Sequence, residues 1–109
     1  MSERILLVLA REGRLGDDTL VRPVRTQAGL VDALASNQSA VSKVLRRLVA
    51  AELLTEERRH VAGRNQRLKV YALTRRGEQL ARELARRRNV SLLPKLSAEG
   101  EVPTPPSPG

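Results

Sequence analysis

Hydrophobic and polar residues alternate at helical spacing in the middle of the chain, which predicts two short helices joined by a tight turn. In the second helix, over about residues 39–51, Val41, Leu45 and Leu48 share one side at about 100° per residue. Ser39 is expected to cap it, because a serine hydroxyl can accept a hydrogen bond from the first helical turn. The first helix is expected to begin at Thr26, to direct Leu30, Val31 and Leu34 inward, and to end in the turn Ala35-Ser36-Asn37.

The second helix is basic on the side opposite its hydrophobic stripe. Lys43, Arg46 and Arg47 lie, together with Ser39, within about 60° of the direction opposite to Val41. No acidic residue shares that side. One face can therefore be buried while the other contacts a polyanion, which is the layout of a helix that enters a DNA groove.

The N-terminal part combines an apolar run with a loop. Residues 5–10 favour a buried helix that stops at Gly13, because leucine outnumbers β-branched residues, with a buried strand as the alternative. This run is too short to span a bilayer. Residues 13–25 hold several loop-forming residues, with a possible short edge strand at residues 20–22 that Pro23 ends.

The segment after the basic helix predicts a β-hairpin. Residues 53–58 and 68–73 are β-prone, and they flank the basic segment 59–67, which contains Gly63. Strand alternation leaves the register open, since Leu68 and Leu73 do not fit one strict phase. The residues expected on one face are Leu54, Val70 and Ala72.

The chain is expected to end in one more helix and a tail. Thr74 can cap this helix, and Leu80 and Leu84 share its inner face. Residues 94–109 are rich in Pro, Ser, Gly and Glu, and this composition is typical of disorder. We therefore expect one domain over residues 1–93 and a disordered Pro-rich tail over residues 94–109.

Composition limits what the protein can bind. The 109 residues include 20 Lys and Arg against 12 Asp and Glu, a formal net charge of +8, which favours nucleic acid or another anionic partner. The chain has no cysteine and a single histidine, His60, so no set of metal ligands of the usual kind is expected. No cofactor is expected either.

Nothing in the sequence predicts an enzyme. The chain contains no phosphate-binding glycine loop and no nucleophile elbow, and Glu56 and Glu57 would point to opposite faces of a strand. Tyr71, the single aromatic residue, is expected in the hairpin core rather than as a stacking platform. We expect a cytoplasmic protein associated with the nucleoid and with no membrane partner.

Four strings together carry a resemblance to a known family. They are TQxxLxxxL, QSAVSKVLRRL, AELLxEER and KVYALTRRGEQLA, and they lie between Thr26 and about Leu84. This part of the chain resembles winged helix-turn-helix transcription regulators that are MarR-like in the broad sense. The resemblance implies a mainly α fold with a small β-hairpin (α+β), in which a three-helix core carries a wing and a C-terminal helix.

The resemblance also implies a DNA interface. The helix at about residues 39–51 would lie in the major groove, and the wing at about residues 59–67 would contact the flanking backbone or the minor groove. The DNA-binding residues expected on this basis are Gln38, Ser39, Ser42, Lys43, Arg46, Arg47, Arg59, Arg64, Asn65 and Arg67.

Two turns depart from the family pattern. The helix-turn-helix turn usually holds a glycine followed by an apolar residue, where this chain has Ala35 and Ser36. Glu52 likewise stands where a glycine usually precedes the Leu-Leu pair. These turns must therefore avoid a positive φ or accept strain.

The favoured function is a sequence-specific regulator that binds double-stranded DNA as a homodimer. The alternative is a winged helix that binds protein or RNA inside a larger assembly. Apolar residues that one core does not require motivate the dimer, because surplus apolar surface often marks an interface. These residues are Leu7, Val8, Leu92 and Leu93.

Overall fold

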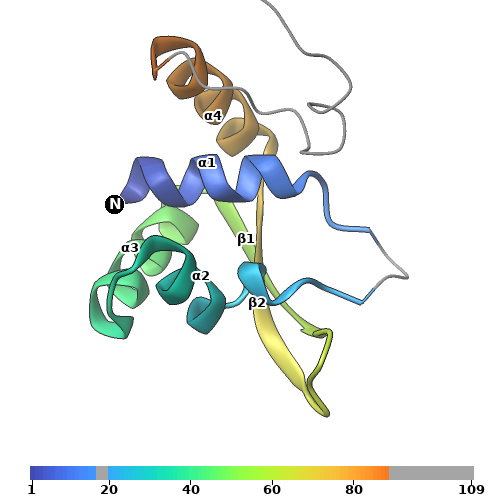
Figure 1. Cartoon of the computed structure of the whole chain (residues 1–109). Coiled ribbons are helices and arrows are strands. Elements are labelled where there is room, and N and C mark those ends of the chain that lie inside the picture. The colour runs from blue at the N-terminus through green and yellow to red at the C-terminus, as the bar shows by residue number, and fades with distance from the viewer. Residues whose placement is uncertain (17–19, 89–109) are drawn as a thin grey trace, which may run out of the picture.

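A computed structural model describes residues 1–16 and 20–88 (Figure 1). The chain forms four α-helices, one short 3-10 helix and a two-stranded antiparallel sheet within these ranges. In chain order the elements are α1 (Ser2–Glu12), η1 (Pro23–Arg25), α2 (Gln27–Leu34), α3 (Gln38–Ala50), β1 (Leu54–His60), β2 (Arg67–Leu73) and α4 (Arg75–Arg88). The predicted winged helix-turn-helix fold is confirmed.

The main core lies where the helices meet the base of the hairpin. Helix α1 runs between α4 on one side and the pair α2 and α3 on the other, while the hairpin extends away from them (Figure 1). Ile5, Leu6 and Leu9 of α1 are at most 1% exposed, so the apolar N-terminal run is a buried helix as predicted. The other buried members of this core are Leu30, Leu34, Val41, Val44, Leu45, Leu48, Leu54, Tyr71, Ala81 and Leu84.

A second, smaller apolar cluster covers the other face of the hairpin. Val21, Val61 and Val70 are buried together there, with Leu15 and Leu68 packed against them. Val21 pairs with Val61 in a single parallel bridge, in which the Val21 N–H donates to the His60 carbonyl at 3.0 Å. The predicted edge strand at residues 20–22 is thus reduced to one bridge, and η1 follows it directly.

The predicted phase of the hairpin is wrong. Leu54 lies directly opposite Leu73, and cross-strand partners share a face, so Leu54 lies with Leu73 and Tyr71 in the main core. Val70 and Ala72 point to the opposite face. Both faces of the sheet are partly buried, and the apolar residues therefore do not follow a single alternation.

The two helices of the helix-turn-helix begin at polar caps. The Thr26 side chain accepts a hydrogen bond from the Gly29 N–H at 3.0 Å, which confirms the predicted start of α2. In α3 the cap is Asn37 rather than Ser39, because the Asn37 Oδ1 accepts from the Ala40 N–H at 2.8 Å. Helix α3 therefore starts at Gln38 and ends at Ala50, one residue earlier at each end than predicted.

Both turns that lack the family glycine adopt the left-handed conformation. Ala35 has φ 52° and Glu52 has φ 62°. Non-glycine residues rarely adopt such angles, because Cβ then approaches the backbone too closely. The chain therefore accepts strain at these two turns rather than avoiding the conformation.

Helix α4 is held tightly against the turn that leads into the hairpin. The Thr74 Oγ1 accepts a hydrogen bond from the Gly77 N–H at 3.0 Å, which confirms Thr74 as the cap, and it donates to the Glu52 carbonyl at 2.6 Å. A Cβ at position 77 would lie 2.1 Å from the Leu53 carbonyl oxygen. Only glycine allows this approach, so Gly77 fixes the position of α4. The predicted tail, residues 94–109, and the pair Leu92 and Leu93 lie outside the described residues.

Candidate nucleic-acid interface

Helix α3 separates an apolar face from a basic face. Val41, Val44, Leu45 and Leu48 are buried in the main core, with at most 9% of each exposed. This burial fixes the rotation of the helix about its own axis. The residues predicted to contact DNA from α3 are consequently turned outward: Gln38, Ser39, Lys43, Arg46 and Arg47 are exposed, and Ser42 is half-buried.

Helix α2 supports α3 from the side. Leu30 and Leu34 are buried, and the Gln27 side-chain amide donates to the Gln38 carbonyl at 3.3 Å. This bond joins the first residue of α2 to the first residue of α3. The N-terminal end of α3, which reads bases in helix-turn-helix proteins, is therefore held by its neighbour.

The wing carries basic residues on one of its faces. The register places Arg58 opposite Lys69 and His60 opposite Arg67, so these four side chains share the face that holds Leu54, Tyr71 and Leu73 at its base. All four are exposed. Arg58 and Lys69 bring two positive charges opposite each other, and the Glu56 carboxylate on the same face lies 3.6 Å from the Lys69 ammonium group. The predicted site omitted Arg58, His60 and Lys69. Period-two alternation from Arg67 would have identified Lys69.

The predicted wing residues have different surroundings. Arg64 and Asn65 lie exposed in the tip between β1 and β2, and Arg67 is exposed at the start of β2. Arg59 is half-buried on the opposite face, where its guanidinium donates to the Gly16 carbonyl and lies 3.7 Å from the Glu57 carboxylate. Arg59 thus ties the loop after α1 to the wing.

A buried arginine that the sequence did not single out connects the helix-turn-helix to the wing. Arg25 is 4% exposed and donates to the carbonyls of Glu12, Gly13 and Tyr71 at 3.2, 2.6 and 3.3 Å. Burial lowers the pKa of Arg25 and Arg22 adds to this effect, whereas Glu12 raises it. An arginine stays charged after such a shift, and its fork of donors suits several carbonyls at once. Arg25 thereby holds the end of α1, η1 and β2 together.

Tyr71 belongs to the hairpin core, as predicted, since it is 5% exposed. Burial raises the pKa of its hydroxyl, and Glu56 on the opposite strand raises it further through its charge and a hydrogen bond. The ring is therefore a packed, neutral side chain. It offers no stacking surface for an unpaired base.

Ion pairing divides the basic residues into two groups. Arg14, Arg22 and Lys69 each lie within 3.6 Å of a carboxylate oxygen, on Glu78, Glu12 and Glu56. Within residues 1–16 and 20–88, several others have no carboxylate within 4.0 Å, and these concentrate on α3, the wing and α4. They include Lys43, Arg46 and Arg47 on α3, Arg58, Arg64 and Arg67 on the wing, and Arg75, Arg82, Arg86 and Arg87 on α4, whereas Arg4, Arg11 and Arg25 are the remaining ones.

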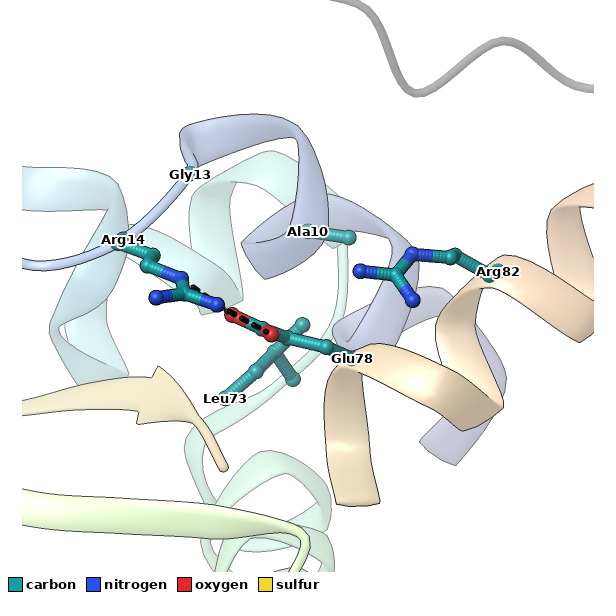
Figure 2. A pocket seen from close by; sticks show the side chains of 6 residues that line it. All are labelled: Ala10, Gly13, Arg14, Leu73, Glu78 and Arg82. Carbon is teal, nitrogen blue, oxygen red and sulfur yellow. Dashed lines mark hydrogen bonds and ion pairs between the residues drawn. The ribbon is translucent and has the colours of Figure 1, made fainter. Parts of the chain in front are cut away.

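An open hollow of about 200 Å³ lies between the end of α1, the end of β2 and the start of α4 (Figure 2). Arg14 donates two hydrogen bonds to the Glu78 carboxylate at its edge, at 3.2 and 3.3 Å. These two groups satisfy each other, and no hydrogen bond or ion pair joins them to the Arg82 guanidinium beside them (Figure 2). Among the described residues no cluster of three His, Cys, Asp or Glu side chains is placed to hold a metal ion. None of the helices described is long and apolar enough to cross a membrane.

The fold and its exposed basic helix define a winged helix-turn-helix protein, and comparison with solved structures agrees. The apo form of a doubly substituted ZitR from Lactococcus lactis is 27% identical, with a TM-score of 0.61, over 81% of this chain and 56% of that chain. Rv1404 from Mycobacterium tuberculosis is 26% identical, with a TM-score of 0.59, over 81% of this chain and 51% of that chain. No protein-family model and no curated protein sequence matches the chain.

ZitR and Rv1404 are MarR-family winged-helix transcription regulators and not enzymes. The chain therefore shares the winged helix-turn-helix fold of these MarR-family structures. The match spans about half the length of each of these structures. The likeness therefore extends over the DNA-binding fold, with a large part of each relative left unmatched.

Proposed function

We propose that this protein is a transcriptional regulator that binds double-stranded DNA in a sequence-specific manner. One observation carries the proposal: the outward face of α3 holds Lys43, Arg46 and Arg47 beside neutral polar residues, with no carboxylate within 4.0 Å of the three cations among the described residues. Arginine and lysine recognise guanine edges and phosphates, and glutamine and serine recognise base edges. This mixture suits a helix inserted in the major groove.

The proposed binding mode uses the wing as a second contact. Arg64, Asn65 and Arg67 reach the flanking backbone or the minor groove, and Arg58 and Lys69 extend the same basic surface. Arg59 contributes by holding the wing to the loop after α1. The domain over residues 1–93 carries these contacts, and the segment 94–109 takes no part in them.

We propose that the regulator acts as a homodimer in the cytoplasm, at the nucleoid. Two α3 helices about 34 Å apart could read a pseudo-palindromic site. Leu7 and Val8 are half-buried and pack against the main core, and Met1 is 40% exposed at the start of α1. A dimer contact through the described residues would therefore involve the outer side of α1. Sedimentation at micromolar concentration tests it, and a persistent monomer that binds one per site would contradict it.

The test of the function is selection of bound fragments from the source genome, followed by titration of the recovered site. A regulator of this kind should bind its site at least about 1,000-fold more tightly than random duplex at near-physiological salt. Weak binding without sequence preference would contradict the proposal. It would instead support the protein or RNA interaction module.

A further inference from the structure

Helix α4 carries more positive charge than α3 does. Its 14 residues include six arginines and two glutamates, a net charge of +4, which is half of the formal +8 of the whole chain. One of the two glutamates, Glu78, is already held by Arg14. The proposed contact of α3 with DNA leaves this charge unexplained.

Three of these arginines form a stripe along the helix. Arg75, Arg82 and Arg86 lie within about 40° of one another at 100° per residue, at spacings of about 10 and 6 Å along the axis. All three are exposed, and within the described part of the chain none has a carboxylate within 4.0 Å. We call these three residues the α4 stripe. Glu83, the other acid of α4, lies about 60–100° to one side of it.

The α4 stripe lies on the side of α4 away from its buried residues, with Arg82 at the border of the hollow that Arg14 and Glu78 share. The buried residues of α4 are Gly77, Ala81, Leu84 and Ala85, and they turn toward the core. Helix α1 lies between α4 and the pair α2 and α3 (Figure 1). A duplex that occupies the outward face of α3 is therefore out of reach of the α4 stripe.

The chemistry of the stripe fits a phosphate backbone better than a protein surface. A protein interface requires apolar anchors at its centre, whereas the exposed large hydrophobic residues among those described are Met1 and Leu20, neither of them on α4. Phosphate contacts require only regularly spaced cations, and arginine binds phosphate oxygens in a bidentate manner. Gln79 is the one neutral side chain on this side that could contact a base edge, so little sequence preference is expected.

We propose that the α4 stripe binds the phosphate backbone of a second DNA segment without sequence preference. One protein molecule then holds two segments, one on α3 and the wing and the other on α4. The contact is electrostatic and non-covalent, so it weakens with salt. This surface goes beyond the sequence-specific contact proposed above and does not depend on it.

The test uses the full chain and three variants of equal net charge. The first variant, R75Q/R82Q/R86Q, removes the α4 stripe. The second, R11Q/R22Q/R76Q, removes three other exposed arginines and has the same net charge. The third, K43Q/R46Q/R47Q, removes the basic face of α3. A duplex immobilised on beads, with the protein bound to it, then captures a second, fluorescent duplex of random sequence.

The unmodified protein and the R11Q/R22Q/R76Q control should both capture the second duplex. The R75Q/R82Q/R86Q variant should capture about tenfold less, with the magnitude of its salt slope reduced by about 2–3, while its affinity for the selected site changes less than about twofold. The K43Q/R46Q/R47Q variant should lose the selected site but still bind random duplex through α4. Thermal midpoints near that of the parent show that each variant is folded.

Three results would overturn the proposal. If capture of the second duplex survives removal of the α4 stripe, the two duplexes are held by the two α3 helices of a dimer. Equal losses of capture in the stripe variant and in its charge-matched control would mean that capture depends on net charge and not on the position of the stripe. Binding of polyglutamate, but not duplex, to the stripe of the K43Q/R46Q/R47Q variant would identify an acidic protein as the occupant. If the protein binds no selected site but still captures random duplex, the proposed sequence-specific function is contradicted. The proposal for the α4 stripe is then unaffected.

Discussion

Helices α3 and α4 are both basic, both amphipathic and both rich in cations without acidic partners, yet their exposed faces differ in composition. The outward face of α3 mixes Lys43, Arg46 and Arg47 with serine and glutamine. The α4 stripe consists of arginines, with glutamates at its sides. Positive charge alone brings a helix to DNA, whereas reading a sequence also requires neutral donors and acceptors that match base edges. The difference therefore supports the proposals that α3 reads the sequence and that α4 contacts the phosphate backbone.

Removal of the cations of α3 should have the largest effect on DNA binding. Replacing Lys43, Arg46 and Arg47 together by alanine should lower affinity for the selected site by at least about 100-fold, because each good bidentate base contact contributes about 1–3 kcal/mol. Titration of the selected site and of random duplex gives the two losses. The thermal midpoint should hardly change, since all three side chains are exposed.

Single substitutions then separate base contacts from phosphate contacts within α3. Arg47→Ala should cost more on the selected site than on random duplex if its guanidinium recognises a guanine. Equal losses on both duplexes would assign Arg47 to the backbone. A drop of many degrees in the thermal midpoint would show that the inward and outward faces of α3 have been exchanged.

The substitution Gly77→Ala tests whether α3 and α4 belong to one rigid unit. Gly77→Ala would place a Cβ against the Leu53 carbonyl oxygen, so we expect the free energy of unfolding to fall by about 1–3 kcal/mol as α4 is displaced. Chemical denaturation measures this loss. Gln79→Gly on the same helix is the control, because Gln79 is exposed and this change lowers helix propensity by about 1 kcal/mol without a clash or a lost core contact. An unchanged stability of the Gly77→Ala variant would mean that α4 adjusts freely.

Substitutions in the wing should lower DNA affinity less than those in α3, and without sequence preference, as expected for α4. Arg64→Ala and Arg67→Ala should each weaken binding to all sequences alike and reduce the magnitude of the salt slope by about 1. Arg59→Ala is the contrasting variant, because its guanidinium contacts Gly16 and Glu57 within the protein. A sequence-dependent loss at Arg64 or Arg67 would instead show that the wing reads bases.

The smallest expected effect concerns the turns at the two ends of α3. Ala35→Gly and Glu52→Gly should each stabilise the protein by about 0.5–1 kcal/mol, because glycine relieves the left-handed strain at the expense of a more disordered unfolded chain. Both positions are exposed, and the Glu52–Arg76 pair at 3.9 Å lies in solvent and contributes little. Thermal denaturation measures the gain, and DNA affinity should not change. A loss of stability would show that contacts of the Ala35 and Glu52 side chains contribute more to stability than the backbone strain costs.

The sequence predicted the parts of the structure that depend on local periodicity. The inward and outward faces of α3 were correct because Val41, Leu45 and Leu48 repeat at helical spacing. The phase of the hairpin was wrong because alternation presumes one buried face, and here Leu54 and Val70 are buried on opposite faces. The cap of α3 was misplaced by two residues, since Asn37 and Ser39 are both competent caps and only the backbone conformation distinguishes them.

The buried position of Arg25 could not be predicted from the sequence. Its three acceptors lie 12, 13 and 46 residues away, and no local pattern signals that an arginine beside a helix cap will be buried. Lys69 differs, because it lies two residues after Arg67 on β2 and alternation alone places both on one face; only its position opposite Arg58 depends on the strand register. Candidate residues on helices were thus accessible to sequence reasoning, whereas those set by pairing between distant segments were not.

The close approach of Gly77 to Leu53 has a consequence for the path of bound DNA. Because this approach and the hydrogen bond from Thr74 to Glu52 hold α4 beside the turn that ends α3, the two basic surfaces share one fixed orientation. Two duplex segments held by these surfaces would cross at a set angle instead of swivelling about the protein. DNA loops closed by the protein in this way would favour lengths that recur with the helical repeat of DNA, about every 10.5 base pairs.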